Sequence, residues 1–239
     1  MTEPLLSIVI PAYNEAQRIQ NSLDKVRRFR ELAPYSTEVI VVDDGSTDQT
    51  TKTLSAFPNV RLVRNDRNRG KGYSVRHGVL EGRGEFVLFT DADLSTPIEE
   101  VDELLAILRS TGADAALGSR ALRRELIGVH QPWGREIAGR FFNLLVRTFT
   151  GLRVHDTQCG FKLFRRSSTR RAFELMRVEG FGFDPELLFL IAKTGGRVVE
   201  VPVRWNNDPA TKVKFLRDST RMFLDLIAIR WRFLSGGYR

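Results

Sequence analysis

The chain has 239 residues, and 42% of them are hydrophobic, which is enough for the core of one large globular domain. Lysine and arginine outnumber aspartate and glutamate by 37 to 29, so the formal net charge is +8. This excess favours an anionic partner such as phosphate, nucleic acid or an acidic membrane surface. Cys159 is the only cysteine, which excludes an internal disulfide and gives no sign of a thiolate metal cluster.

Residues 1–4 run directly into an apolar segment and lack the basic region and long apolar core of a signal peptide. No stretch approaches the roughly 20 apolar residues that span a bilayer. From these features we expect a cytoplasmic protein, soluble or peripheral on the cytoplasmic face of a membrane.

Apolar runs that favour buried strands recur in the first half of the chain, at residues 5–11, 39–42, 60–63, 86–90 and 115–118. Segments with helical periodicity or helix-start residues lie between them, as in the helical face formed by Ile19, Leu23, Val26 and Phe29. Strands that alternate with helices predict an α/β fold with a mostly parallel, doubly wound sheet flanked by helices.

After Ser119 this rhythm changes. Residues 137–149 and 222–234 have the pattern of amphipathic helices, and 198–205 alternate as a strand does. Asp184-Pro185-Glu186 is typical of a helix start, with proline in the first turn and acids at the positive end of the helix dipole. No repeat or linker divides the chain, so we predict one domain over residues 1–239, with halves at 1–118 and 119–239.

Asp91-Ala92-Asp93 is the most informative motif, because it directly follows the apolar run 86–90. Open α/β sheets bind ligands at the carboxyl ends of their strands. Two carboxylates there repel each other unless a cation lies between them, and Mg²⁺ is often bound by one or two carboxylates together with substrate phosphates. We therefore predict that Asp91 and Asp93 form a metal site for a phosphorylated substrate. The alternative is that Asp93 or Ser95 simply caps the next helix.

Polar clusters also follow two earlier strands, at residues 11–15 and 43–46. If the strands are neighbours, these side chains converge with Asp91 and Asp93 on one crevice. Tyr13 offers a flat ring on which a base can pack, and Asp43 or Asp44 has a carboxylate that can accept the imide N–H of uracil. Taken singly, each cluster is also explained as a helix start or a tight turn.

Gly70-Lys71-Gly72, preceded by Arg67 and Arg69, offers cations and backbone amides to phosphates. It is not a P-loop, since Asn65 stands where the first glycine is required and no Ser or Thr follows Lys71. No G-x-G-x-x-G motif follows a strand, so a nicotinamide cofactor is not indicated. The alternative for this segment is a solvated basic turn.

Taken together, the chain resembles the family 2 glycosyltransferases with the GT-A fold. The segments that carry this resemblance are 7–15, 41–48, 68–72 and 91–93. Later segments are similar to dolichyl-phosphate β-glucosyltransferases: 118–120, 156–164, 183–188 and 200–205. The resemblance implies an inverting, metal-dependent hexosyltransferase that moves glucose from UDP-glucose to a polyprenyl phosphate and uses Mg²⁺ or Mn²⁺. Residues 1–118 would bind the nucleotide sugar and residues 119–239 the acceptor.

The resemblance also implies roles for individual residues. Uridine would contact Pro11, Tyr13, Glu15, Asp43 and Asp44. Asp91 and Asp93 would hold the metal, Arg120 and Arg135 would face the lipid phosphate, and Lys71 and Lys212 would reach toward phosphates. Gln158 and Lys162 would line the site, with a packed loop as the alternative for both. The candidate catalytic residues are Asp93, Arg120 and Asp184. The chain departs from the family pattern at Pro185, where relatives usually carry valine, at Thr211, where they carry serine, and in lacking an N-terminal membrane-spanning helix.

A phosphate acceptor removes the need for a general base. A phosphate monoester, with a second pKa near ~6, is mostly dianionic at neutral pH and attacks the sugar directly. The site must instead hold two anions together, which explains a need for arginines. Asp184 and Glu186 are expected near the site, and a capped helix start is the alternative for both.

The segments 137–149 and 222–234 carry more large apolar residues than one buried stripe requires, and Arg221, Arg230 and Arg232 lie within the second. Aromatic and basic residues on amphipathic helices suit docking to a membrane surface with anionic lipids. Core packing or a dimer interface is the alternative.

Other functions fit some of these features. A phosphoacceptor receiver module also has acidic strand ends, but its acidic pair ends the first strand, and Val201 stands where its lysine would precede Pro202. Nucleic-acid binding is suggested by charge alone, so no nucleic-acid partner is predicted. The same fold and metal would also suit GDP-mannose as the donor or a sugar hydroxyl as the acceptor.

Overall fold

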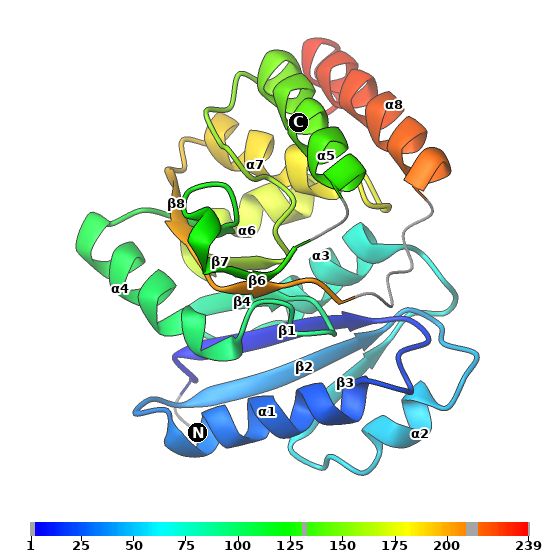
Figure 1. Cartoon of the computed structure of the whole chain (residues 1–239), viewed down its shortest axis with the longest axis vertical. Coiled ribbons are helices and arrows are strands. Elements are labelled where there is room, and N and C mark those ends of the chain that lie inside the picture. The colour runs from blue at the N-terminus through cyan, green and yellow to red at the C-terminus, as the bar shows by residue number, and fades with distance from the viewer. Residues whose placement is uncertain (1–2, 131–132, 209–214, 239) are drawn as a thin grey trace.

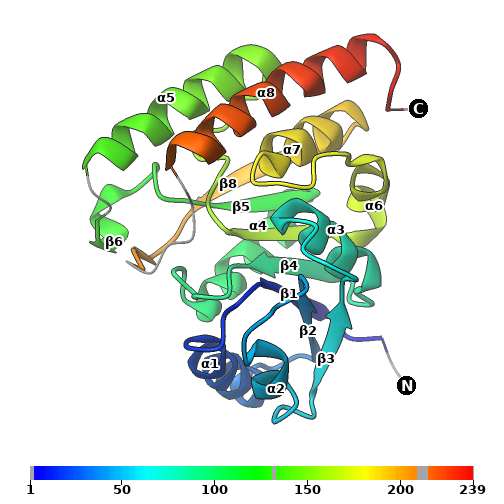
Figure 2. The ribbon, with the colours of Figure 1, turned by 90° about the vertical axis from the view of Figure 1, so that its right-hand side faces the viewer.

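Among the residues that the structure describes, seven strands form one central sheet with helices on both faces (Figures 1 and 2). This computed structural model describes residues 3–130, 133–208 and 215–238, without the side chains of residues 135 and 215–217. The strands of the sheet are β1 (Leu6–Ala12), β2 (Thr37–Asp43), β3 (Val60–Arg64), β4 (Phe86–Thr90), β5 (Ala115–Ser119), β7 (Phe161–Arg165) and β8 (Val198–Pro202). A second, two-stranded sheet pairs β6 (Ile127–Val129) with β9 (Trp205–Asn206).

The strands of the main sheet lie in the order β3-β2-β1-β4-β7-β5-β8. β7 is antiparallel to both of its neighbours, β4 and β5, and the other pairs are parallel. The predicted α/β class with a mostly parallel sheet is therefore confirmed.

The helices form layers on the two faces of this sheet. One face is covered by α1 (Ile19–Leu32), α2 (Thr50–Leu54) and α4 (Val101–Thr111), which follows a short 3₁₀ turn (Ile98–Glu100). The other is covered by α3 (Lys71–Glu81), α6 (Arg166–Leu175) and α7 (Phe183–Lys193). The long helices α5 (Trp133–Thr150) and α8 (Phe215–Leu234) lie side by side and pack on α7 (Figure 2).

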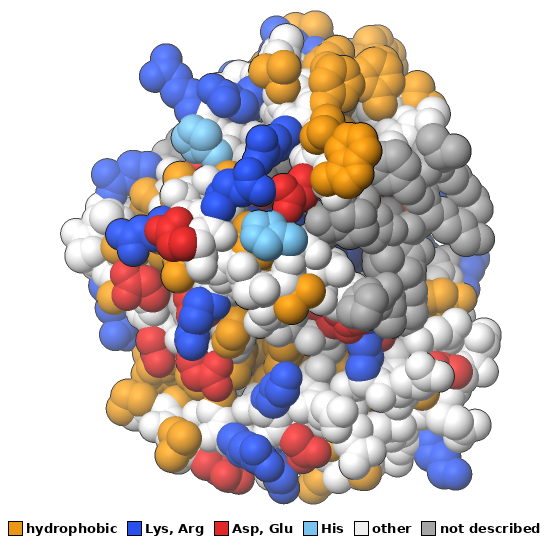
Figure 3. Space-filling view, viewed as in Figure 1, with side chains coloured by type: hydrophobic (Ala, Val, Ile, Leu, Met, Phe, Trp, Pro, Cys, Tyr) orange, Lys and Arg blue, Asp and Glu red, His pale blue; other side chains and the backbone are white. Residues whose placement is uncertain are grey.

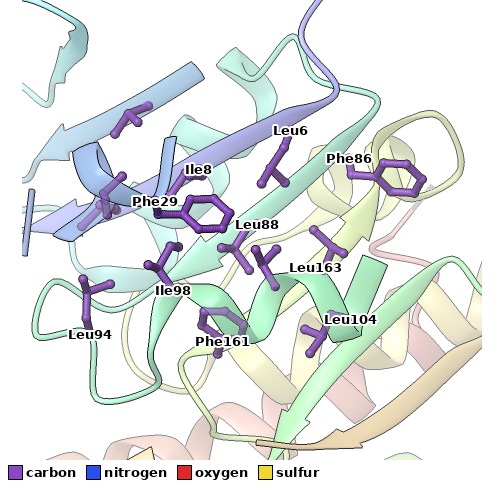
Figure 4. Close-up of a cluster of buried hydrophobic side chains, with 14 of the residues drawn as sticks. Leu6, Ile8, Phe29, Phe86, Leu88, Leu94, Ile98, Leu104, Phe161 and Leu163 are labelled. Carbon is purple, nitrogen blue, oxygen red and sulfur yellow. The ribbon is translucent and has the colours of Figure 1, made fainter. Parts of the chain in front are cut away.

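Alternation along each strand divides the core between these layers. In β1, Leu6, Ile8 and Ile10 face α1 and α4, whereas Val9, between Ile8 and Ile10, faces the α3 side. Figure 4 shows the first cluster, in which Phe29 of α1 and Leu104 of α4 approach the side chains of β1 and β4. Since both faces are buried, the central strands read as nearly continuous apolar runs, which is why they are recognisable in the sequence.

Strand β7 and helix α6 are not predicted from the sequence. Lys162 interrupts the apolar run of β7, yet it is fully buried in the structure. The predicted strand over 198–205 is divided, because Pro202 ends β8 and has no N–H for a further ladder bond. Helices α5 and α8 begin at residues 133 and 215, several residues before the predicted starts at 137 and 222.

Gly78 lies where α3 crosses β1 and β2. A Cβ at this position would overlap Val9 and lie 2.7 Å from Val42 Cγ2. We expect Gly78→Ala to lower the free energy of unfolding by about 1–3 kcal/mol, because overpacking pushes α3 away from the sheet. Gly139 in α5 meets nothing within 4 Å, so Gly139→Ala should raise the free energy of unfolding by about 0.5–1 kcal/mol. Urea unfolding measures both, and equal effects would contradict the close packing at Gly78.

Candidate active site

Three strand ends meet at one edge of the sheet. β2, β1 and β4 are neighbours in this order and run parallel, so their carboxyl ends lie together. Asp43 is the last residue of β2, Tyr13 follows β1, and Asp91 follows β4. The structure thus brings together the three polar clusters at the place where open α/β sheets bind ligands.

The end of β1 combines an accessible aromatic ring with a buried acid. Pro11 lies in β1 opposite Val42, and Tyr13 is 36% exposed. Glu15 is buried and accepts hydrogen bonds from the guanidinium of Arg18. The exposed ring of Tyr13 offers a flat surface on which a planar base can pack, whereas Glu15 is engaged with Arg18.

Asp43 and Asp44 are buried and are both hydrogen-bonded within the protein. Asp43 accepts from the backbone amide of Ser46 at 3.0 Å. Asp44 accepts from the backbone amides of Arg69 and Gly70, at 2.9 and 2.8 Å. Asp44 therefore holds the Gly-rich turn against the end of β2. Contact of either carboxylate with a uracil ring stays a prediction.

Asp91 is at the centre of the site. The Nζ atom of Lys71 lies 2.7 Å from Asp91 Oδ1. The backbone amide of Asp91 donates to Gly160 O at 3.0 Å, because the end of β4 pairs with the start of β7, Thr90 with Phe161. A Cβ on Gly160 would overlap the Asp91 carboxylate, so only glycine allows this close approach.

Asp93 faces the same edge with a partly exposed side chain. Its Oδ1 accepts from the backbone amide of Ser95 at 2.9 Å, and its Oδ2 lies 3.9 Å from Arg18 Nη1. Burial and then the charge of Asp91 raise the pKa of the Asp93 carboxyl. Two carboxylates that disfavour each other's charge are a donor set that a hard divalent cation stabilises, so Asp91 and Asp93 fit such an ion.

No group of three or more His, Cys, Asp or Glu side chains within the described ranges is arranged to hold a metal. A cation on Asp91 and Asp93 would therefore draw further ligands from the substrate or from water. This is the arrangement typical of Mg²⁺ bound together with phosphates.

A buried ion pair adjoins this cluster. Lys162 Nζ lies 2.6 Å from Asp184 Oδ1 and also donates to Cys159 O at 2.6 Å. Burial raises the pKa of Asp184, although the charges of Lys162 and Lys71 oppose the rise. For Lys71, burial alone would lower the pKa, but the attraction of Asp91 and Asp184 outweighs it and the pKa is raised. Positive and negative groups therefore alternate through the site.

Arg120 is anchored by a second buried acid. Its Nε and Nη2 atoms lie 2.7 and 2.8 Å from the two carboxylate oxygens of Asp156, and its backbone amide donates to Asp156 at 3.0 Å. Burial alone would raise the pKa of Asp156, but the Arg120 guanidinium holds it below its usual value. The ring of Trp205 lies 5.2 Å from the guanidinium carbon. Bidentate pairing fixes the orientation of Arg120 as well as its charge.

Arg120 lines a cavity of about 380 Å³ beside α5. Three further arginines line it, Arg124, Arg140 and Arg147, as do the apolar side chains of Ile127, Leu144 and Trp205 and the polar side chain of Gln158. The Arg124 guanidinium is paired with Glu136 at 2.6 Å. The Arg147 guanidinium has no hydrogen bond or ion pair with the part of the chain that the structure describes. The cavity thus joins positive charge to an apolar wall.

Glu186 has a structural role. It is fully buried, and its carboxylate accepts from the backbone amides of Arg177 and Val178 at 2.9 and 2.7 Å and from the Tyr238 hydroxyl at 2.6 Å. The sequence predicts Glu186 near the site with Asp184, or as part of a capped helix start, and any part in the reaction stays a prediction. The Glu186 carboxylate ties the loop before α7 to the C-terminal part of the chain.

Two predicted residues are not placed. Arg135 belongs to α5, but its side chain lies outside the described residues, and so does the whole of Lys212. Their contacts with phosphates stay predictions.

Sequence reasoning missed three residues of this site: Asp156, Gly160 and Arg18. Asp156 and Gly160 lie within the segment 156–164, which was recognised as a motif without roles for these two residues. Arg18 belongs to no motif, and its ion pair with Asp208, at 2.8 Å, joins residues 190 positions apart.

Residues 7–173 match the model of glycosyl transferase family 2. The chain belongs to this family. Three relatives named dolichyl-phosphate β-glucosyltransferase support the narrower resemblance. The one from Dictyostelium discoideum is 33% identical over 97% of this chain and 75% of its own length. Those from Drosophila melanogaster and Homo sapiens are 37% and 35% identical, each over 98% of this chain and 77% of the relative. Membership of a glycosyltransferase family identifies an enzyme and leaves no place for the receiver interpretation.

Solved structures of glucosyl-3-phosphoglycerate synthase from Mycobacterium tuberculosis share this fold. Its complex with UDP has a TM-score of 0.64 at 22% identity, covering 95% of this chain and 79% of that one. A complex with Mn²⁺, UDP and phosphoglyceric acid has a TM-score of 0.65, also at 22% identity, and covers 95% and 77%. At this identity the likeness establishes the GT-A fold.

Lys162→Met should lower the free energy of unfolding by about 3–5 kcal/mol, because it leaves the buried Asp184 carboxylate without its partner. In this variant the pKa of the Asp184 carboxyl would stay above its value in the unfolded chain, so the folded state binds the proton more tightly. The free energy of unfolding should therefore fall as the pH rises from the unfolded-state pKa to the folded-state pKa of Asp184. Adding Asp184→Asn should restore much of the loss. Urea unfolding across this pH range measures the loss in Lys162→Met, its pH dependence and the recovery in the double variant. Equal stability of the single and double variants would mean that lost packing, and not the unpaired carboxylate, causes the loss.

Proposed function

We propose that the chain transfers glucose from UDP-glucose to a polyprenyl phosphate, with inversion, to give a β-linked lipid phosphosugar. The observation that carries this proposal is the position of Arg120. Anchored on Asp156, it lines the arginine-rich cavity and is close enough to Asp91 for their charges to interact. One guanidinium thus connects the predicted metal site to a cavity with both phosphate-binding and apolar walls. The names of the relatives support glucose and the polyprenyl acceptor.

The donor would lie across the ends of β1, β2 and β4. Its uracil ring would pack on Tyr13, in a crevice formed also by Pro11, Glu15, Asp43 and Asp44. Asp91 and Asp93 would hold Mg²⁺ or Mn²⁺ at the diphosphate, where such a cation supplies Lewis-acid assistance to the departing nucleoside diphosphate. Lys71 would meet the diphosphate from the other side. The Mn²⁺ and UDP named in the synthase complexes support this placement.

The acceptor phosphate would bind Arg120, with Arg135 and Lys212 as further contacts, and the first part of the prenyl chain would pack on Leu144 and Ile127. Because the phosphate is already an anion, it attacks the anomeric carbon without losing a proton, and the bond to the diphosphate breaks on the opposite face. Asp184 is paired with Lys162 and has no proton to accept in this reaction. Its contribution would be to hold Lys162 and Lys71 in place.

A panel of donors tests this function. The purified protein is incubated with UDP-glucose or GDP-mannose, a short polyprenyl phosphate and Mn²⁺, and the lipid products are identified by mass spectrometry. We expect transfer from UDP-glucose that is lost on chelation and falls at least about 100-fold in Asp93→Ala. Transfer from GDP-mannose alone would support the mannosyl alternative, and transfer only to a free sugar would contradict the lipid acceptor.

Arg120→Lys should raise the KM for the polyprenyl phosphate by about tenfold, because lysine cannot pair in bidentate fashion with both Asp156 and a phosphate. The KM for UDP-glucose should change little. Arg28→Lys, an exposed arginine on α1, is the matched control. Equal effects on both substrates would remove Arg120 from the acceptor site.

We also propose that α5 and α8 dock on the anionic, cytoplasmic surface of a membrane. Most of the exposed large hydrophobic residues of the described chain lie on these two helices: Trp133, Ile137, Phe141 and Leu144 on α5, and Phe223, Leu224, Ile227, Trp231 and Leu234 on α8. Figure 3 shows hydrophobic side chains gathered at the top of the molecule, where α5 and α8 lie in Figure 1. Exposed arginines such as Arg221 and Arg230 accompany them. None of the described helices combines the length and apolar content needed to cross a bilayer.

Sedimentation with lipid vesicles tests this surface. The double variant Leu224→Ser/Leu234→Ser should bind vesicles containing phosphatidylserine at least about tenfold more weakly, because two apolar side chains no longer enter the interface. Leu32→Ser is the matched control, since Leu32 is 85% exposed but lies on α1. Unchanged binding of the double variant, or equal loss in the control, would contradict docking through α8.

A further inference from the structure

Lys71 lies where a cation on Asp91 would also lie. Its ammonium nitrogen is 2.7 Å from Asp91 Oδ1, and the charges of Asp184 and Asp93 also act on it. Asp93 has a more distant partner, since Arg18 Nη1 is 3.9 Å away and pairs with Asp208 at 2.8 Å. In this arrangement the ammonium group compensates the charge that a metal ion would otherwise compensate.

The backbone that carries Lys71 is closely packed. Gly70 N donates to Asp44 Oδ2 at 2.8 Å. A Cβ on Gly70 would lie 2.5 Å from Glu179 O, and one on Gly72 would lie 2.6 Å from Val178 O. The backbone of Lys71 at the start of α3 is therefore held in place, and only its flexible side chain can move to a new partner.

The charges at this edge disfavour each ligand when it arrives alone. A divalent cation would have to displace the Lys71 ammonium from Asp91 and remain beside it. A diphosphate would meet the carboxylates of Asp91 and Asp93. With both ligands bound, Asp91 and Asp93 would hold the cation and the Lys71 ammonium would contact the diphosphate, so like charges would no longer be in contact.

We propose that Lys71 exchanges Asp91 for the diphosphate of the donor, so that the metal ion and the nucleotide bind as a pair. The exchange replaces one ion pair by others and forms no covalent bond. It rests on the proposed function in one respect, namely that the donor is a nucleoside diphosphate sugar whose cation is held by Asp91 and Asp93. Lys71 would then prevent metal binding without substrate and also contribute to diphosphate binding.

Binding of Mn²⁺, followed by the EPR signal of the free ion with and without UDP, tests the exchange. In the wild-type protein UDP should tighten Mn²⁺ binding by about 10- to 100-fold. Lys71→Met should bind Mn²⁺ alone at least about tenfold more tightly than the wild type, because no ammonium competes for Asp91, and UDP should add much less. Lys71→Arg, which keeps the positive charge, should stay near the wild type.

Lys25→Met controls for the loss of one positive charge, because Lys25 is exposed on α1, and it should bind Mn²⁺ as the wild type does. Lys71→Gln gives the same comparison if the methionine variant does not fold, as judged by thermal unfolding. Equal Mn²⁺ affinity of the wild type and both neutral variants, with UDP still tightening the wild type, would overturn the exchange and leave the donor site intact. Failure of the wild type to bind Mn²⁺ even with UDP would overturn the donor site itself.

Discussion

Burying a charge without a partner is strongly destabilising, and this constraint organises the whole site. The pairs Arg120–Asp156, Lys162–Asp184 and Lys71–Asp91 each join opposite charges within hydrogen-bond distance. Asp93 has a less direct counter-charge, with Arg18 at 3.9 Å. Asp93 thus lies where the proposed cation and diphosphate would add their own charges.

The antiparallel strand β7 makes this network possible. Because it runs opposite to β4, its amino end meets the carboxyl end of β4, and Gly160 lies against Asp91. Lys162, two residues later, is then close enough to Asp184 to pair with it. A parallel strand in this position would have its amino end beside the amino end of β4, far from Asp91. The antiparallel course of β7 therefore brings Gly160 against Asp91 and Lys162 against Asp184, beside Lys71 of α3.

The C-terminal half adds two features on the other side of the site. The cavity beside α5 is lined both by arginines and by Leu144 and Ile127, a combination that would suit a molecule with a phosphate head and an apolar chain. Leu144 is also among the exposed apolar residues of α5 and α8. The proposed membrane surface and the proposed acceptor cavity therefore share a residue, which would shorten the path of a lipid from bilayer to donor.

The sequence by itself determined the alternating strands of the first half and the acidic motif after β4, because fully buried strands and strand-end carboxylates leave local patterns. The sequence also determined the family, because the motifs of the family are short and contiguous. It did not determine β7, where Lys162 breaks the apolar pattern, or the division of 198–205 at Pro202. Only the tertiary structure decided that Asp184 pairs with Lys162, that Asp156 anchors Arg120 and that Glu186 holds a loop. The first two contacts join residues far apart in the chain. Asp184 and Glu186 are close in sequence, yet their side chains have different partners. Local patterns record which residues are buried, whereas the partner of a buried charge is decided by how the elements pack.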